Sequence, residues 1–308
     1  MKKVILYLFM LFMLTGCDLL SFLGNPKLEN EVSIIVPNGI PYLAVAGIKE
    51  NENVKMDTTT GGENLKAALL GGEYDLVVAP INVGAQLFAA GKSKYQMVTP
   101  ITFNNAYIVC REELPLESID DLIGKSVTAF NQTGIPAQVL TKIYNDNSAL
   151  DIANVDFTLK SSAQVYQSFV GEGNDDNYVL MSEPEISKVI INNKIAIKTL
   201  DLCSVLGESI PQAALFVNPD ANLEDVNIVI DMIEDNIKEM NTNTASCIDK
   251  VLTVDEEFFS AIGKEVLLSS VPRANVKFDL ENRKTESANV FALLGVKGVT
   301  DAFYYEKD

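Results

Sequence analysis

Polar and glycine residues occupy the turns that follow predicted strands, and these groups are well placed to bind a small molecule. In open α/β sheets, ligands bind beyond the carboxyl ends of strands, where loops lead into helices. Amide and hydroxyl side chains there can donate and accept hydrogen bonds, and glycines let a ligand approach the backbone closely. The candidate ligand-binding residues are Asn38, Gly39, Thr60, Gly61, Gly62, Asn82, Asn105, Gln132, Thr133, Glu183 and Gln212.

Several of these residues also have a purely structural explanation. Gly61 and Gly62 could only relieve strain at a helix start, and Asn82 could simply cap its helix. Glu183 has no capping role in the sequence pattern, although the helix dipole stabilises any carboxylate at a helix start. Both explanations stay open at the level of sequence.

The composition excludes much of the common catalytic repertoire. The 308 residues include no histidine, so a Ser-His-Asp triad, a Cys-His pair and a two-histidine zinc site are all impossible. The net charge is −18, which argues against a nucleic-acid surface, because such surfaces need clustered Lys and Arg. We therefore expect no catalytic residue, no metal site and no cofactor, and we expect that the protein is not an enzyme.

The N-terminus carries an export signal. Two lysines precede an apolar run of 11 residues, 4–14, which is too short to span a bilayer. The small residues before Cys17 make the segment resemble a bacterial lipoprotein signal, in which the cysteine becomes the first residue and is acylated. We predict a signal peptide at residues 1–16, a tether at 17–30 and an extracytoplasmic protein that is lipid-anchored to the cell membrane. The alternative is an ordinary signal peptide in which the cysteine falls there by chance.

Three further cysteines, Cys110, Cys203 and Cys247, cannot all pair within the chain. Small buried thiols are the favoured interpretation. One disulfide with a free thiol is the alternative.

Short apolar runs alternate with helical patterns over residues 31–106 and again over 107–199. This alternation predicts an α/β protein with mostly parallel sheets that are covered by helices on both faces. From residue 219 onward the pattern is largely helical, including one helix over 256–268. Capping-box patterns begin at Thr60, Ser161 and Ser182.

Five segments stand out by their order and spacing along the chain. They are residues 37–44, 61–85, 116–127, 183–185 and 210–212. In order and spacing they are similar to solute-binding lipoproteins of ABC importers, in the nitrate/taurine/sulfonate/thiamine-precursor class with the type II periplasmic-binding fold. The resemblance covers about residues 31–305.

The resemblance implies a two-lobed monomer that traps a small molecule and hands it to ABC permease subunits. Lobe one would comprise residues 31–106 plus 217–308, and lobe two residues 107–216. The chain would cross between the lobes near residues 107–111 and 215–218.

The candidate loops contain no arginine, and Arg111 near a crossing is the one that could reach them. An anion can be held by backbone amides and helix N-termini, although an arginine would bind it more strongly. We therefore favour a vitamin or vitamin precursor, with a sulfonate-like solute as the other ligand class. A surface sensor or binding lipoprotein without transport is the alternative function. Enzymes that resemble this family use a histidine or act inside cells. This sequence has no histidine and a predicted export signal, so it does not favour such an enzyme.

Overall fold

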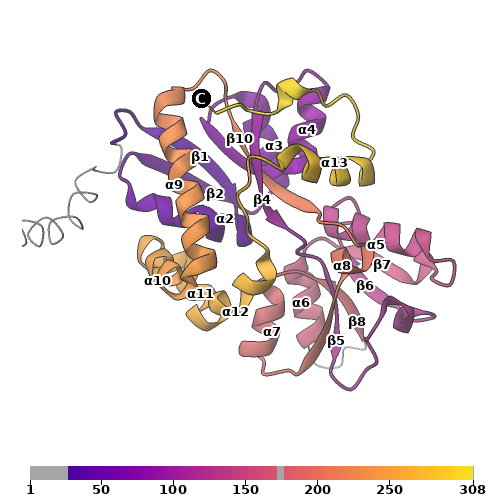
Figure 1. The fold of residues 1–308 in the computed structure, drawn as a ribbon. Coiled ribbons are helices and arrows are strands. Elements are labelled where there is room, and N and C mark those ends of the chain that lie inside the picture. Colours follow the sequence, from indigo (N-terminus) through magenta and orange to yellow (C-terminus); the bar gives the residue numbers. More distant parts are fainter. Residues whose placement is uncertain (1–26, 172–176, 308) are drawn as a thin grey trace, which may run out of the picture.

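The computed structural model of the protein describes residues 27–171 and 177–307, which form two β-sheets flanked by helices (Figure 1). The predicted signal peptide, Cys17 and most of the predicted tether lie outside the described residues. Within the described part of the chain, no helix has both the length and the apolar character needed to cross a bilayer.

The first sheet has the strand order β2-β1-β3-β10-β4. Strands β2 and β3 pair in parallel with β1, whereas β10 runs antiparallel to both β3 and β4. Helices cover both faces of this sheet, so β3 and β4 are almost entirely buried. The strands are β1 (Val32–Pro37), β2 (Val54–Thr59), β3 (Leu76–Pro80), β4 (Gln96–Phe103) and β10 (Pro211–Val217).

The helices of the first sheet come from both ends of the chain. Two apolar clusters, one on each face, hold them against the strands. They are α2 (Ile40–Val45), η1 (Ala46–Glu50), α3 (Gly62–Gly71), α4 (Ile81–Ala89), α9 (Leu223–Thr242), α10 (Thr244–Val254), α11 (Glu256–Ile262), α12 (Lys264–Ala274), α13 (Arg283–Leu293) and η4 (Asp301–Phe303).

The second sheet repeats this plan with the order β7-β6-β8-β5-β9. Strand β6 pairs in parallel with β7 and β8, and β5 runs antiparallel to β8 and β9. Its strands are β5 (Tyr107–Arg111), β6 (Val127–Phe130), β7 (Val155–Leu159), β8 (Tyr178–Met181) and β9 (Ile197–Asp201). Its helices are η2 (Ile119–Leu122), α5 (Ile135–Asp146), η3 (Ile152–Asn154), α6 (Ser162–Val170), α7 (Glu185–Ile191) and α8 (Leu202–Leu206).

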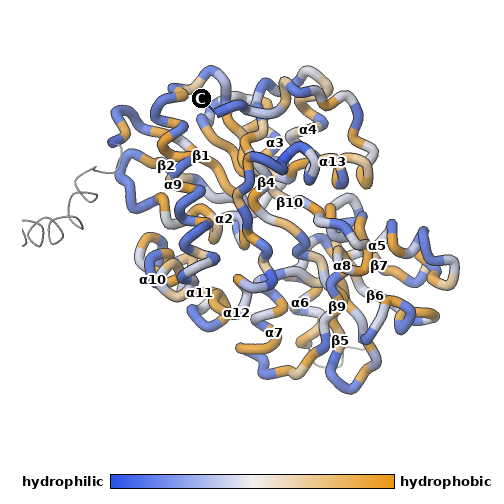
Figure 2. The backbone as a smooth tube through the Cα atoms, viewed as in Figure 1, coloured by the Kyte–Doolittle hydropathy of each residue, from blue (hydrophilic) through white to orange (hydrophobic). Residues whose placement is uncertain are grey.

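Each sheet with its helices forms one lobe. Lobe one comprises residues 27–103 and 211–307, and lobe two comprises residues 107–171 and 177–206. In both lobes hydrophobic strands run through the interior and hydrophilic segments lie outside (Figure 2). One apolar cluster continues from the α3–α4–α13 face of lobe one into lobe two.

The chain crosses between the lobes twice, at residues 104–106 and 207–210. The sequence placed both crossings a few residues later, near 107–111 and 215–218, and it placed the end of lobe two at 216. The difference has one cause. All of β5 pairs within the second sheet and all of β10 within the first, so each crossing must be complete before its strand begins.

The α/β architecture is confirmed, with one difference in each sheet. Four strands of each sheet run in one direction, and the strand that follows a crossing, β10 or β5, runs the other way. The helix predicted over residues 256–268 is two helices, because Gly263 between them has φ 96°, a left-handed conformation that suits glycine.

Only one of the three predicted capping boxes has its serine or threonine as the cap. Ser161 Oγ accepts a hydrogen bond from Gln164 N at 3.3 Å, as predicted. Thr60 does not cap α3; instead Thr59 Oγ1 accepts from Gly61 N at 3.2 Å and from Asn64 Nδ2 at 2.8 Å. Cys110, Cys203 and Cys247 are buried free thiols, which confirms the favoured interpretation of the cysteines.

The C-terminal helices are held on lobe one by a polar contact beneath an aromatic cluster. Asp255, between α10 and α11, accepts hydrogen bonds from the Tyr42 hydroxyl and, at 2.9 Å, from Lys49 Nζ. The buried Tyr42 ring lies 4.8 Å from the Phe259 ring. Burial opposes ionisation of Asp255, but the hydrogen bonds from Tyr42 and Lys49 outweigh it and hold the pKa of the carboxyl below its usual value.

We expect Asp255→Asn to lower the free energy of unfolding at pH 7 by about 2 kcal/mol, because it removes charge-assisted hydrogen bonds. Since the folded-state pKa of Asp255 is depressed, its contribution is present above the unfolded pKa and is lost as pH falls through the folded value. The gap between wild type and variant should therefore close below about pH 4. Urea unfolding from pH 7 to pH 2 measures this. Asp249→Asn, on an exposed pair with Lys264, is the control and should cost less than about 0.5 kcal/mol.

Candidate functional site

The edges of the two sheets that carry the candidate residues lie on either side of the first crossing. Residues 104–106 join the carboxyl end of β4 to the amino end of β5. Because β5 runs antiparallel to β8, its amino end lies at the same edge as the carboxyl ends of β6 and β8. The turns that follow the parallel strands of both lobes therefore lie at the edges that the crossing connects.

Strand order sets how the candidate residues line up along lobe one. Strand β1 is central to the group, with β2 on one side and β3 and β10 on the other. The backbone of Asn38 continues the ladder beyond β1 by donating to Thr59 O at 2.9 Å. The resulting row runs Thr60, Gly61 and Gly62 after β2, Asn38 and Gly39 after β1, Asn82 after β3, and Gln212 at the start of β10.

Two amide side chains in this row have an unpartnered buried atom. Asn38 Oδ1 and Gln212 Nε2 are buried and have no hydrogen-bond partner among the residues that the structure describes. The strands that carry them are separated by β3, so they lie two strand spacings apart, roughly 10 Å. A buried polar atom without a partner costs about 1–3 kcal/mol, which a bound polar molecule could recover.

The structural alternatives for three other residues in the row are not realised. Gly61 has ordinary extended dihedral angles, φ −105° and ψ 124°, so strain does not require glycine there. A Cβ at Gly62 would meet nothing within 4 Å. Asn82 lies within the first turn of α4 and does not cap it. Thr60 and Gly62 are exposed, so this end of the row is open to solvent.

Lobe two contributes an exposed turn between β6 and α5. Asn131 adopts φ 44°, and its carbonyl accepts from Gly134 N at 2.7 Å, which closes the turn. Thr133 Oγ1 donates to Asn131 Oδ1 at 3.2 Å, and the backbone carbonyl of Gln132 accepts from Gln138 Nε2 at 2.6 Å. The turn therefore holds the side chains of Gln132 and Thr133 at the solvent-exposed start of α5.

The other two candidates, Asn105 and Glu183, bind each other and not solvent. Glu183 N donates to Asn105 Oδ1 at 2.7 Å, and Asn105 Nδ2 donates back to Glu183 O at 3.2 Å. Ser182 Oγ donates to Asn105 O at 2.8 Å, and Pro184 occupies the N-cap position of α7, so Ser182 does not form the predicted capping box. The first crossing is thereby attached to the start of α7.

The Glu183 carboxylate is fully engaged. Its side chain is 0% exposed; Oε1 accepts from Arg273 Nε, and Oε2 accepts from Ser187 N at 3.1 Å. Burial raises the pKa of Glu183 above its usual value, although Arg273 and Ser187 favour the ionised form. Glu183 therefore does cap α7, contrary to the sequence interpretation, and both of its oxygens already have partners.

Arg273 is the residue of this contact that the sequence did not point to. It lies on α12 in lobe one, and its Nη2 donates to Ser187 Oγ of lobe two at 3.0 Å. Its carboxylate partner, Glu183, is 90 positions away in the chain, so no local motif could reveal the pair. Arg111, which the sequence considered, donates to Phe169 O at 3.3 Å and stacks over the Phe169 ring inside lobe two.

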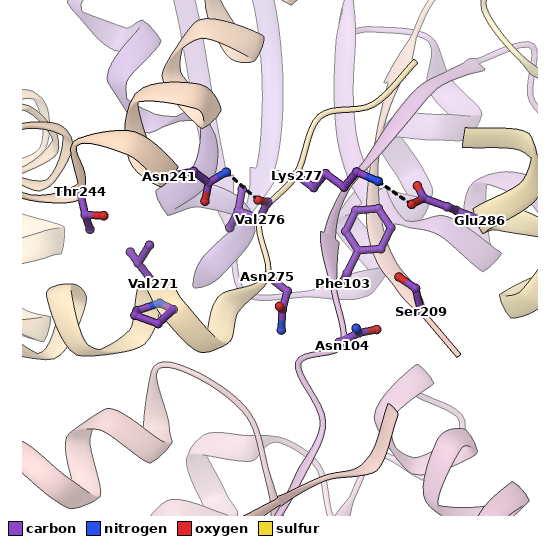
Figure 3. A pocket seen from close by; sticks show the side chains of 11 residues that line it. Phe103, Asn104, Ser209, Asn241, Thr244, Val271, Asn275, Val276, Lys277 and Glu286 are labelled. Carbon is purple, nitrogen blue, oxygen red and sulfur yellow. Dashed lines mark hydrogen bonds and ion pairs between the residues drawn. The ribbon is translucent and has the colours of Figure 1, made fainter. Parts of the chain in front are cut away.

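A cavity of about 540 Å³ lies beside the two crossings (Figure 3). Asn104 of the first crossing and Ser209 of the return crossing both line it, but none of the predicted ligand-binding residues does. Its lysine, Lys277, is paired with Glu286 at 2.6 Å and Asp279 at 2.9 Å. Because the cavity contains none of the predicted residues, whereas the strand-end row has two buried amide atoms without partners, we choose the row as the candidate site. Within residues 27–171 and 177–307, no cluster of three or more metal-ligating side chains was found.

No family model matches the sequence, and no curated protein matches it. Solved structures do match. An ABC transporter protein from Parabacteroides distasonis is 16% identical with a TM-score of 0.73, over 91% of this chain and 100% of that one. The periplasmic aliphatic sulphonate binding protein SsuA from Escherichia coli is 12% identical with a TM-score of 0.69, over 91% and 93%. The ligand-binding component of an ABC-type import system from Staphylococcus aureus, with zinc bound, is 11% identical with a TM-score of 0.65, over 90% and 97%. The chain thus has the fold of periplasmic solute-binding proteins.

We expect Glu183→Ala to lower the free energy of unfolding by about 3 kcal/mol, because it leaves Arg273 without its buried partner. Urea unfolding at pH 7 measures this. Glu117→Ala is the matched control: Glu117 is 81% exposed, pairs with Lys198 at 3.0 Å, and should cost less than about 1 kcal/mol. Equal losses in the two variants would contradict a buried structural role for Glu183.

Proposed function

We propose that this protein is an extracytoplasmic solute-binding lipoprotein that captures a small molecule between its two lobes and delivers it to an ABC importer. The observation that carries the proposal is the pair of unpartnered amide atoms, Asn38 Oδ1 and Gln212 Nε2, in the strand-end row of lobe one. The fold shared with periplasmic binding proteins supports it independently.

The ligand would contact residues of both lobes. From lobe one we propose Asn38, Gly39, Thr60, Gly61, Gly62, Asn82 and Gln212, and from lobe two Gln132 and Thr133. Asn105 and Glu183 support the site by holding the crossing to α7, because their polar groups are already paired.

Capture would work by a shift between open and closed lobe arrangements. A ligand that contacts both lobes favours the arrangement in which both reach it. Moving a population from 1:99 to 99:1 takes about 5.5 kcal/mol of differential affinity. A ligand with micromolar affinity supplies about 8 kcal/mol of binding free energy in total, which exceeds the free energy that this shift needs.

The two unpartnered amides favour an uncharged ligand. Each terminal amide carries a donor and an acceptor, so Asn38 and Gln212 together suit a molecule that presents both. A sulfonate offers acceptors alone and would leave an amide oxygen unpaired. We therefore propose a neutral polar heterocycle, such as a vitamin or its precursor. The competing ligand class is a sulfonate, which is the solute named for the E. coli neighbour. The binding experiment compares the two classes.

The binding experiment uses the full chain. Native mass spectrometry identifies any copurifying molecule, and a thermal-shift screen compares neutral heterocycles, sulfonates and amino acids. A ligand at 100 times its dissociation constant should add about 2.7 kcal/mol of stability, a shift of roughly 5 °C. We expect Asn38→Leu and Gln212→Met to abolish the shift without lowering the unliganded melting temperature, since each removes an unpartnered polar group.

Gln167→Met, on the exposed face of α6, is the matched control and should keep the full shift. A shift that survives both site substitutions would move the ligand away from the strand-end row. Uptake of the identified molecule by cells with and without the protein separates a transport role from a sensor.

The lipid anchor is tested separately. Cys17 follows the apolar run of the predicted export signal, and we propose that it is acylated. In a bacterial host, wild-type protein should sediment with membranes and incorporate a clickable fatty acid, and Cys17→Ser should do neither. Cys203→Ser, at a buried thiol, should behave as wild type. If the Cys17→Ser protein is still labelled by the fatty acid and still sediments with membranes, acylation of Cys17 is ruled out.

A further inference from the structure

Helix α12 connects the two lobes without a covalent link. It packs on α10 and α11 of lobe one and also on α7 of lobe two, and it ends beside the first crossing (Figure 1). The molecule therefore has a third connection besides the chain segments 104–106 and 207–210.

The contact between α12 and α7 is built around a buried charge. Arg273 of α12 pairs with the wholly buried Glu183 carboxylate and donates to Ser187 Oγ at 3.0 Å. The Arg273 carbonyl in turn accepts from the Tyr107 hydroxyl, at the start of β5, at 3.0 Å. Arg273 thus binds lobe two through both its side chain and its backbone.

A second contact between helices of the two lobes has a different character. Helix α13 of lobe one touches α5 of lobe two, and among the described residues no hydrogen bond or ion pair joins these two helices. Apolar contacts of this kind can slide or separate without leaving a charge unpaired. One side of the lobe interface is therefore polar and buried, and the other is apolar and adjustable.

We propose that the α12–α7 contact is the fixed pivot of lobe movement and that Arg273 is a positioning residue for the ligand site. The ligand and the lobe movement both rest on the proposed function, whereas the α12–α7 contact itself is observed. Separating Arg273 from Glu183 would leave a buried carboxylate without its counter-charge, so the lobes move with this pair intact.

The pivot determines which part of the lobe-two edge moves. The Ser182–Glu183 turn after β8 is attached to the pivot through Asn105 and Arg273. The exposed turn of residues 131–133 follows β6, one strand farther out. Rotation about α12–α7 therefore leaves the first turn in place and carries the second toward or away from lobe one.

The test compares Arg273→Met with the double variant Glu183→Met/Arg273→Met, in the full chain without ligand. Small-angle X-ray scattering measures the spread of lobe arrangements, and hydrogen exchange measures protection of residues 182–190. We expect Arg273→Met to lower the melting temperature, to broaden the scattering distance distribution and to raise exchange at 182–190 about tenfold. The control is Arg111→Met, which removes an arginine contact that lies within lobe two. It should leave the scattering distribution and the hydrogen exchange unchanged.

The double variant separates positioning from stability. An apolar pair in place of a buried ion pair is often neutral or stabilising, so the melting temperature should recover. If the pair positions the lobes, the scattering distribution stays broad in the double variant. The proposal is overturned if the double variant recovers both the melting temperature and the scattering distribution, or if neither variant differs from wild type. Because no measurement uses a ligand, a failed ligand screen leaves this result intact, and a confirmed ligand with unchanged scattering refutes the pivot alone.

Discussion

The pairing of β10 between β3 and β4 is the constraint on which the rest of this structure depends. Backbone hydrogen bonds along residues 211–217 require the chain to return to lobe one after it has completed lobe two. That return places α9 to α13 on lobe one and makes the connection between the lobes double. The antiparallel direction of β10 mirrors that of β5, so the turns at the carboxyl ends of both sheets lie at the connected edges. This topology brings the strand-end turns of both lobes to the connected edges before any side chain is considered.

Side chains at those edges divide into two groups by their hydrogen bonding. Asn105 and Glu183 satisfy each other and attach the crossing to α7. Asn38 and Gln212 have buried amide atoms without partners, which is costly unless another molecule meets them. The first group resembles a structural joint and the second a recognition surface. The cavity beside the crossings is lined by polar and apolar side chains alike, and its lysine is neutralised by two carboxylates.

Movement between lobes must be compatible with the charges buried at the joint. Glu183 is 0% exposed, and Arg273 supplies its counter-charge from the other lobe. Separating them would leave the buried carboxylate without its counter-charge. The apolar α13–α5 contact carries no such restriction. The proposed pivot therefore depends on how polar and apolar contacts are distributed between the two sides of the lobe interface.

Local patterns were enough to determine the α/β class, nearly all of the strands, the buried cysteines and the turns that carry the candidate site. These follow from hydrophobic periodicity and from glycine, proline and capping residues, which act over a few positions. The displaced crossings, the reversed β10 and β5, and the partnership of Glu183 with Arg273 across 90 residues were decided by tertiary structure. Strand direction depends on which neighbours a strand finds, and burial of a carboxylate depends on what packs over it. Neither is encoded within the few residues on either side, so Glu183 resembled a free ligand contact until the fold placed Arg273 beside it.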